Sequence, residues 1–221
     1  MDQAIRTGSS MISEAKQIMV FSGAGLSTES GIPDFRSPGG IWDRYDPNDF
    51  HFDRFLAYEE TRERYWRVSG EAYSLMRKAE PNRAHRAIKK LEEAGKLLGV
   101  VTQNIDRLHH KAGSSDDLVV ELHGNAFFVT CLSCNALSGR DEIEERRSAG
   151  ETVPHCRKCG GILKPATVSF GQAMPREAMD RGFDWAVRCD LCLVLGSSLV
   201  VYPAASVPVE AARKGAKLII I

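Results

Sequence analysis

Three short, wholly apolar segments run directly into small or polar residues, and this feature constrains the fold more than any other. Strands that are apolar on both faces are typical of a parallel sheet covered by helices on both sides. Stretches with helical spacing separate the segments, which predicts an α/β fold with a doubly wound parallel sheet. Ligands bind such sheets at the carboxyl ends of the strands, so the three polar ends are expected to converge. The segments and the residues that end them are 18–21 with Ser22-Gly23, 97–102 with Thr102-Gln103-Asn104, and 191–195 with Gly196-Ser197.

The rest of the chain fits the same alternation of strands and helices. Further short strands are predicted at 119–122 and 217–221, and the second of these reaches the last residue, which indicates a sheet truncated at its C-terminal end. The 30–48 segment is rich in Gly, Pro and Asp and is expected to be a long functional loop. Helices are predicted over 11–17, 52–78, 81–94, 141–148, 178–187 and 203–214.

The charge balance limits the partners of the chain. Its 221 residues include 29 basic and 29 acidic side chains, a formal net charge of zero. Nucleic acid and anionic membranes bind to basic surfaces, so neither is expected as a direct partner. No apolar run is long enough to span a bilayer, and the polar first ten residues do not resemble a secretory signal. We therefore expect a cytoplasmic protein, and the oligomeric state stays open.

Four of the six cysteines form two C-x-x-C pairs, which is the most specific local signal in the sequence. Cys131 and Cys134 form the first pair, and Cys156 and Cys159 form the second after 21 intervening residues. This spacing supplies four thiolates for one tetrahedral zinc ion, and a site with four sulfur ligands has no open position for chemistry. We expect one structural Zn²⁺ in a small zinc-ribbon module. A third C-x-x-C pair enters an apolar strand, and we interpret it as two buried free cysteines.

A glycine turn follows the first predicted strand and resembles the phosphate-binding turn of a Rossmann-like dinucleotide site. In Gly23-Ala24-Gly25 the glycines permit positive φ values and let a phosphate approach backbone N–H groups. The full G-x-G-x-x-G pattern is absent because Thr28 occupies the third glycine position. By itself the turn is therefore weak support for a nucleotide site.

The long loop contains an aromatic residue beside a cation. Phe35 could cover a flat ring while Arg36 contacts a phosphate or carboxylate. The alternative is that Phe35 belongs to the core and Arg36 is a surface charge. The sequence alone leaves both interpretations open.

Polar side chains also cluster after two other strands. Gln103, Asn104 and Asp106 follow the strand at 97–102, where turn capping is the alternative to the ligand role that we favour. His123 lies between a strand and Gly124, and this position makes it the best candidate for a general base.

Together these segments resemble the sirtuin family. The resemblance covers residue 20 to the C-terminus, and the motifs occur in the family's order. They are Gly23-Ala24-Gly25-Leu26-Ser27, Gly31-Ile32-Pro33-Asp34-Phe35-Arg36, Thr102-Gln103-Asn104-Ile105-Asp106-Arg107-Leu108-His109, Glu121-Leu122-His123-Gly124, the four zinc cysteines, Phe170-Gly171 and Gly196-Ser197-Ser198-Leu199.

The resemblance implies an NAD-dependent protein deacetylase or deacylase. An acyl-lysine carbonyl oxygen attacks the ribose carbon of NAD as nicotinamide leaves, an alkylimidate forms, and the acyl group ends on ADP-ribose. By the same resemblance, His123 is the catalytic base, Asn104 shares the catalytic role, and the acyl-lysine peptide pairs with a strand that includes Val168, Phe170 and Gly171. The implied cofactor-binding residues are Gly23, Ala24, Gly25, Thr28, Phe35, Arg36, Gln103, Asn104, Ile105, Asp106, Gly196, Ser197 and Ser198.

The family pattern also implies a division of the chain and an acyl preference. Residues 1–124 and 165–221 would form the NAD-binding domain, and 125–164 the inserted zinc module. In relatives that prefer acidic acyl groups, an Arg follows a Tyr at the third position, whereas Val68 follows Tyr65 here. Neutral acyl groups, above all acetyl, are therefore expected.

Two other functions stay open at this point. The same NAD site could transfer ADP-ribose to protein, or the chain could be a non-catalytic module that binds NAD and zinc. Partners under the main interpretation are proteins or peptides that contain acyl-lysine.

Overall fold

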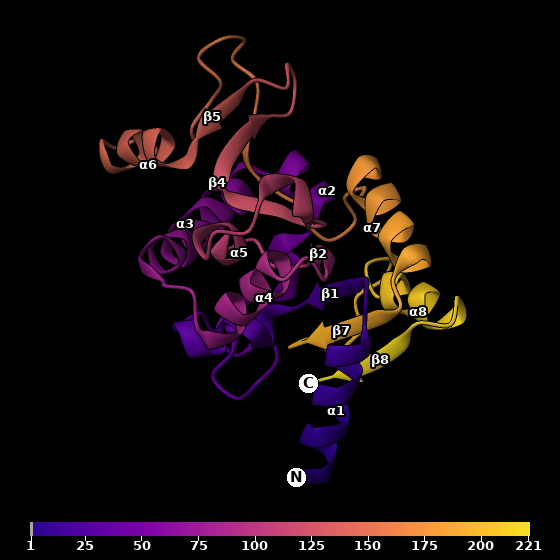
Figure 1. The fold of residues 1–221 in the computed structure, drawn as a ribbon. Helices are drawn as coiled ribbons and strands as arrows, with labels where there is room; N and C mark the ends of the chain where they lie inside the picture. Colours follow the sequence, from indigo (N-terminus) through magenta and orange to yellow (C-terminus); the bar gives the residue numbers. More distant parts are fainter. Residues whose placement is uncertain (1) are drawn as a thin grey trace.

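The computed structural model describes residues 2–221 and contains a five-stranded parallel sheet (Figure 1). The strand order is β3-β2-β1-β7-β8, so the first strand lies in the centre and the chain winds outward from it in both directions. This arrangement confirms the predicted doubly wound parallel sheet. The strands are β1 (Ile18–Ser22), β2 (Leu97–Thr102), β3 (Val119–Glu121), β7 (Leu191–Leu195) and β8 (Lys217–Ile220).

Helices cover both faces of this sheet, which explains why its strands are mainly apolar. Met19 and Phe21 of β1 pack with α7 (Arg176–Arg188) and α8 (Ser206–Arg213). Ile18 and Val20 point to the other face, where the same core includes residues of α4 (Arg83–Glu93) and α1 (Asp2–Glu14). Alternate residues of one strand thus serve two cores, as the two-residue period of a strand requires.

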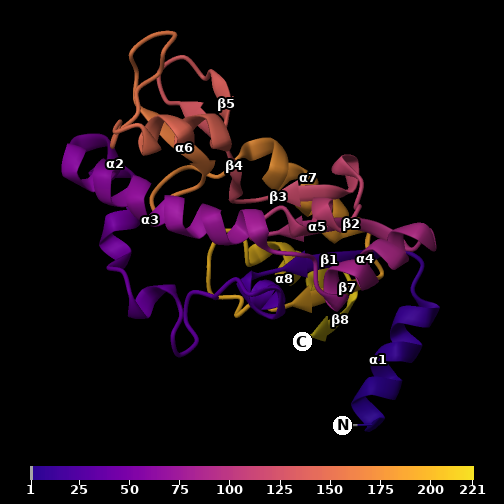
Figure 2. The ribbon, with the colours of Figure 1, turned by 90° about the vertical axis from the view of Figure 1, so that its left-hand side faces the viewer.

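A smaller antiparallel sheet of order β5-β4-β6 forms the upper lobe in Figures 1 and 2. Its core contains two of the four paired cysteines, Cys131 and Cys156, together with Trp66 of α3. The long helix α3 therefore joins this lobe to the rest of the molecule. The elements are β4 (Gly124–Cys131), β5 (Leu137–Gly139), β6 (Leu163–Thr167), α6 (Arg140–Ser148) and α3 (Glu59–Lys78).

Several helix boundaries differ from those predicted. The single helix expected over 52–78 is two helices, α2 (Phe52–Ala57) and α3, because Tyr58 adopts an extended conformation with φ −123° and ψ 130°. Helix α4 begins after Asn82 rather than at Pro81, since the Asn82 side chain accepts hydrogen bonds from two backbone N–H groups and caps the helix. Helix α1 ends at Glu14 and extends far beyond the predicted 11–17 toward the N-terminus.

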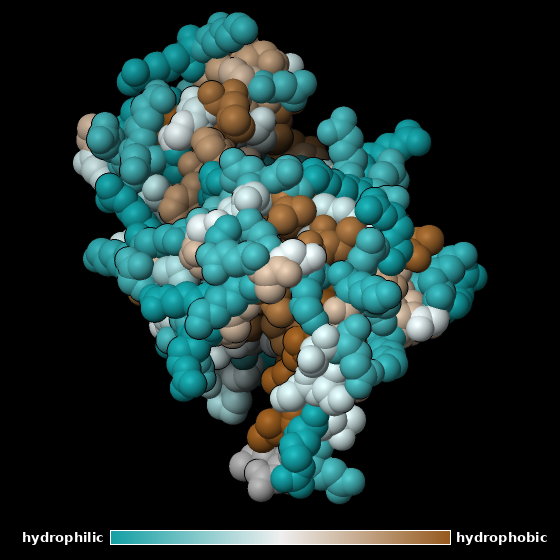
Figure 3. All heavy atoms as spheres, viewed as in Figure 1, coloured by the Kyte–Doolittle hydropathy of each residue, from teal (hydrophilic) through white to brown (hydrophobic). Residues whose placement is uncertain are grey.

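Figure 3 shows a mainly hydrophilic face with a narrow hydrophobic band down the middle toward α1. Helix α1 packs beside the β8 edge of the sheet. A Cβ on its Gly8 would lie 3.8 Å from the Ile219 side chain of β8, which is an ordinary packing distance. None of the helices within residues 2–221 is long and apolar enough to cross a membrane.

Candidate functional site

The ends of β1 and β7 interlock through their backbones. Gly25 donates its N–H to the Gly196 carbonyl at 2.9 Å, and a Cβ on Gly23 would lie 2.7 Å from the same oxygen. Gly196 has φ +61°, and its Cβ would lie 2.1 Å from the N atom of Leu26. The turn therefore requires glycine because two loops meet there. From the sequence, these glycines were explained by positive φ values and by N–H groups available to a phosphate. For Gly23 that explanation is wrong, since its φ is −130° and its N–H is bonded to the Leu195 carbonyl.

A one-turn α-helix, α5 (Leu108–Lys111), and the residues before it place polar side chains beside this turn. Asn104 is buried, and its amide donates to the Gly23 carbonyl at 3.1 Å and to Ser27 Oγ at 3.2 Å. Both amide hydrogens are used in this way, which leaves the amide oxygen as the group that Asn104 offers to a ligand. Asp106 accepts the Ser27 hydroxyl at 2.6 Å, so Asn104, Ser27 and Asp106 form one buried network.

The β2 and β7 tips also meet directly. The Gln103 side chain donates to Ser197 Oγ at 2.8 Å, and the Ser197 hydroxyl oxygen in turn accepts the N–H of Leu199. Thr28, in the third glycine position of the incomplete motif, donates its hydroxyl to the Gly25 carbonyl. All three polar strand ends predicted to converge therefore do so. Ile105 lies partly buried against the core beneath this region, and Ser198 follows Ser197 in the β7 loop.

His123 follows β3, and its hydrogen bond fixes its tautomer. Nδ1 lies 3.0 Å from the Gln103 carbonyl oxygen. A carbonyl only accepts, so Nδ1 carries the hydrogen and Nε2 keeps the lone pair that a general base needs. Burial lowers the pKa of His123, and the bond to Gln103 offsets part of this effect. The neutral imidazole is therefore favoured.

The segment after β6 is held on both sides. Val168 donates its N–H to the His123 carbonyl at 2.9 Å. Phe170 donates to the Phe50 carbonyl and accepts from Phe52, so the 50–52 segment pairs with it. Phe170 is 40% exposed, and Gly171 turns the chain with φ +76°. Val168 thus lies beside the catalytic candidate His123, and Phe170 lies beside the 50–52 segment.

The long loop spans the distance between the glycine turn and this segment. Its Phe35 is 37% exposed and contacts Trp42, with ring centroids 5.2 Å apart. Trp42 in turn lies 5.9 Å from the Phe170 ring. Phe35 is thus not a core residue, and its role in covering a ligand stays a prediction. Arg36 is exposed, and its backbone N–H is bonded to Asp34.

The four paired cysteines converge in the smaller lobe. Their Sγ atoms all lie within 4.8 Å of one another, with 3.5 Å between Cys131 and Cys159 and 3.8 Å between Cys134 and Cys156. Zn–S bonds of about 2.3 Å in a tetrahedron place sulfur atoms about 3.8 Å apart, so the set fits zinc. Cys189 and Cys192 are buried and free, as predicted.

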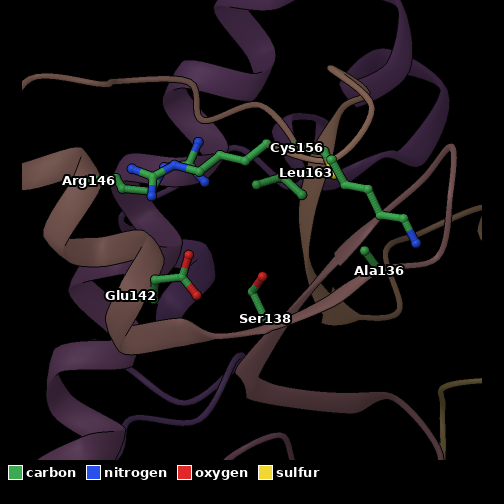
Figure 4. Close-up of a pocket in the computed structure, with 8 residues that line it drawn as sticks. Ala136, Ser138, Glu142, Arg146, Cys156 and Leu163 are labelled. Atoms are coloured by element: carbon green, nitrogen blue, oxygen red, sulfur yellow. The ribbon is translucent and has the colours of Figure 1, made fainter.

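A pocket of about 160 Å³ lies in the smaller lobe, apart from the strand tips (Figure 4). Glu142 and Arg146 of α6 and Ser138 of β5 line it. Arg146 is already bonded to Glu151 and to the His155 carbonyl, so its charge is neutralised locally. Cys156, one of the four paired cysteines, also lines the pocket, which therefore lies next to the zinc site and not at the strand tips.

Some functional candidates were missed by sequence reasoning. Ser27 lies in the glycine motif but received no role, and its partner Asp106 is 79 positions away. His109 ends one of the recognised motifs and was also given no role, and its Nε2 lies 3.0 Å from the buried Ser22 Oγ. No pattern in the sequence predicted that the Lys164 side chain is fully buried. Contacts between distant segments are not encoded in a local pattern.

Comparisons with known proteins agree with this geometry. The model of the Sir2 family matches residues 23–203. The NAD-dependent protein deacetylase of Rhodopseudomonas palustris is 47% identical over 96% of this chain and 83% of its own length. The NAD-dependent protein deacylase 2 of Archaeoglobus fulgidus is 41% identical over 100% of this chain and 85% of its own.

Solved structures are similarly close. A Sir2 structure with a deacetylated p53 peptide and 3'-O-acetyl ADP ribose matches with a TM-score of 0.91 and 39% identity, over 98% of this chain and 85% of that chain. Sir2Tm bound to a propionylated peptide matches with a TM-score of 0.87 and 38% identity, over the same shares. The resemblance in the motifs, the matched family model and the shared fold lead to one conclusion: the chain belongs to the Sir2 family, the sirtuins.

Proposed function

We propose that this chain removes acyl groups, acetyl first among them, from protein lysine side chains with NAD as cosubstrate. The products are nicotinamide, free lysine and O-acyl-ADP-ribose. The names of the relatives, NAD-dependent protein deacetylase and deacylase, support this activity. The observation that carries it is the fixed tautomer of His123 beside both the Gln103 backbone and the Val168 strand.

The residues present fit NAD. The polar ends of β1, β2 and β7 meet at one place, and both N–H donors of the Asn104 amide are used inside the protein, so its oxygen is the atom that it offers to the cofactor. Bound NAD supplies an activated ribose carbon that accepts the acyl oxygen. The residues that we propose to hold it are Gly23, Ala24, Gly25, Thr28, Phe35, Arg36, Gln103, Asn104, Ile105, Asp106, Gly196, Ser197 and Ser198.

The chain's own side chains then position groups and move one proton. We assign to His123 Nε2 the removal of a ribose hydroxyl proton, since the lone pair is there and the neutral form is favoured. Asn104 orients the ribose, and Phe35 excludes water above it. Val168, Phe170 and Gly171 bind the peptide by strand addition. Cys131, Cys134, Cys156 and Cys159 hold one structural zinc.

We also infer the domain organisation, the cellular compartment and the partners of the protein. Residues 1–124 and 165–221 form the NAD-binding domain, and 125–164 the zinc module. Free thiolates for zinc need a reducing compartment, which supports the cytoplasm. The zero net charge supports acyl-lysine proteins or peptides as partners, rather than nucleic acid or membranes.

The test is mass spectrometry of an acetyl-lysine peptide incubated with NAD and the chain. We expect deacetylated peptide and O-acetyl-ADP-ribose in equal amounts, with the rate reduced at least 100-fold in His123→Ala. His155→Ala, which removes an exposed imidazole, should keep the wild-type rate. ADP-ribose attached to protein without deacetylated peptide would instead show a transferase, and no nicotinamide release would show a binding module.

A further inference from the structure

Lys164 is a buried cation directly behind the proposed peptide-binding segment. It has no solvent exposure, and its Nζ donates to the carbonyl oxygens of Thr167 and of Pro165, the latter at 3.4 Å. No ion pair joins it to a carboxylate within residues 2–221. A buried lysine normally has an acidic partner, because an unpaired charge is costly to remove from water. Here the partners are backbone carbonyls.

An irregularity in the smaller sheet explains why those carbonyls need a donor. Val129 of β4 pairs with Pro165 of β6, but the next pair joins Gly124 to Thr167. Four residues of β4, 125–128, thus face a single residue of β6, and β4 bulges away from its neighbour. The Lys164 ammonium supplies hydrogen-bond donors in the place where the ladder is interrupted.

Tyr65 of α3 fixes the same segment through its side chains. Its hydroxyl lies 3.1 Å from Thr167 Oγ1, and Ser169 Oγ donates to it at 3.5 Å. The Lys164 ammonium lies 5.5 Å from the centroid of the Tyr65 ring, as in a cation–π contact. Burial alone raises the pKa of Tyr65, yet the Lys164 charge and the two hydroxyls lower it overall. Tyr65, Lys164, Thr167 and Ser169 thus form one connected cluster of side chains.

These contacts support the segment that continues beyond the end of β6. Thr167 and Ser169 contact the Tyr65 hydroxyl, whereas Phe170 is 40% exposed on the surface proposed for the peptide. Lys164 holds the backbone and Tyr65 holds the two hydroxyls on the hidden side. The exposed edge is thereby presented in one conformation before any peptide arrives.

We propose that Lys164 and Tyr65 are positioning residues that set the backbone of 167–170 for the acyl-lysine peptide, an inference that rests on the proposed function. Their hydrogen bonds go to residues 165–169, and not to His123 or to the residues proposed to hold NAD. Their loss should weaken peptide binding and leave NAD binding largely unchanged. This selectivity separates positioning from a general loss of stability.

The experiment compares Lys164→Met and Tyr65→Phe with the wild-type chain. Met keeps the apolar stem of lysine without its donors, and Phe removes one hydroxyl. A fluorescent acetyl-lysine peptide is titrated without NAD, and steady-state KM values for peptide and for NAD are measured. A net hydrogen bond corresponds to about 2- to 10-fold in affinity, so the peptide Kd and KM should rise about 2- to 10-fold in each variant. The KM for NAD should change less than about twofold.

The chain offers matched controls for both substitutions. Lys96 also donates its Nζ to backbone carbonyls, those of Ile12 and Ser13, but it lies just before β2, at the opposite end of that strand from the tips. Tyr73 is on the same helix as Tyr65 and donates its hydroxyl to Asp141 at 2.9 Å. Lys96→Met and Tyr73→Phe should keep the peptide KM within about twofold of the wild-type value.

Each other result has a defined meaning. An unchanged peptide KM in both test variants, or an equal rise in the KM for NAD, would overturn the positioning role. If circular dichroism shows that Lys164→Met does not fold, Tyr65→Phe decides alone, because it removes only an oxygen. A wild-type chain that binds no acetyl-lysine peptide refutes the proposed function itself, which the wild-type titration reveals before any variant is compared.

Discussion

His123 shows how a single backbone contact prepares a side chain for catalysis. The Gln103 carbonyl directs the imidazole hydrogen to Nδ1, and burial favours the uncharged ring. The position of His123 at a strand end could be read from the sequence. Its tautomer could not, because the acceptor is a backbone atom 20 positions away.

The lowered pKa of His123 sets the acid limb of the pH profile. The base acts only when neutral, so activity is lost as the pH falls through its pKa. Because burial lowers that pKa, the limb of kcat/KM should have its midpoint below the ordinary histidine value of about 6.5. Rates on an acetyl-lysine peptide between pH 4.5 and 8.5 measure it. A midpoint at or above 6.5 would contradict the assignment.

His109 predicts a second, separate effect of pH, on stability. Burial, with the charges of His85 and His110, lowers its pKa to about 3. Above pH 6.5 the ring is neutral in both the folded and unfolded states and contributes nothing. Below 6.5 only the unfolded chain takes up the proton, so stability falls by up to about 1.4 kcal/mol per pH unit until the folded pKa is reached.

Urea unfolding at several pH values between 4 and 7 tests this. His109→Gln should reduce the loss of stability on acidification by up to about 1.4 kcal/mol per pH unit, whatever its effect at neutral pH. His155→Gln, which changes an exposed side chain, should leave the slope as it is. Identical slopes in the wild-type chain and His109→Gln would show that His109 does not resist protonation.

Among the elements, the sheet and the position of the long loop were predictable, but the contacts that the loop makes were not. The strands at 97–102 and 191–195 are mainly apolar, and the structure places both beside β1 as expected. Helix boundaries were less predictable, because the break at Tyr58 lies inside an unbroken aromatic pattern. The role of Phe35 depends on Trp42 and Phe170, and no local pattern connects those positions.

The loops after β1 and β7 should respond together to a change in one glycine. In Gly196→Ala the new Cβ would clash with the backbone of Leu26 and would hold alanine at φ +61°. We expect a loss of more than about 3 kcal/mol in the free energy of unfolding. Gly31→Ala is the control, because φ is +83° there but nothing lies within 4 Å of the Cβ. It should cost only about 1 kcal/mol.

Urea denaturation of the two variants separates conformational strain from the clash, since both positions share a positive φ. Similar losses in Gly196→Ala and Gly31→Ala would mean that the two loops separate easily. That result would weaken the view that their backbones form one rigid cofactor turn.

Across the whole molecule, α3 makes the two lobes depend on each other. Its Trp66 packs with Cys131 and Cys156, while Tyr73 and Met76 pack with Ile32 and Leu108 from the loops after β1 and β2. The cysteine spacing predicted the zinc module, but not that a helix far from it in the sequence would complete its core.

We therefore expect zinc removal to destabilise the entire chain. The wild-type chain should hold one zinc per chain by elemental analysis and unfold in a single calorimetric transition. Cys134→Ser should lose the metal on dialysis and unfold at a lower temperature, again in one transition. Cys192→Ser should keep its zinc, because that thiol lies in the main core. A separate early transition for the smaller lobe in Cys134→Ser would show that the lobes are independent.

The central position of β1 in the sheet affects how the chain folds while it is being synthesised. One edge of β1 pairs with β2, but its other edge has to wait for β7, which begins 89 positions after the end of β2. At about 5–20 residues per second, a ribosome needs roughly 5–20 s to cover that distance. During this interval the nascent chain carries an apolar strand with an open edge, which is the kind of segment that chaperones shield. The hydrogen bond between Gly25 and Gly196 cannot form until nearly the whole of this sequence has been synthesised.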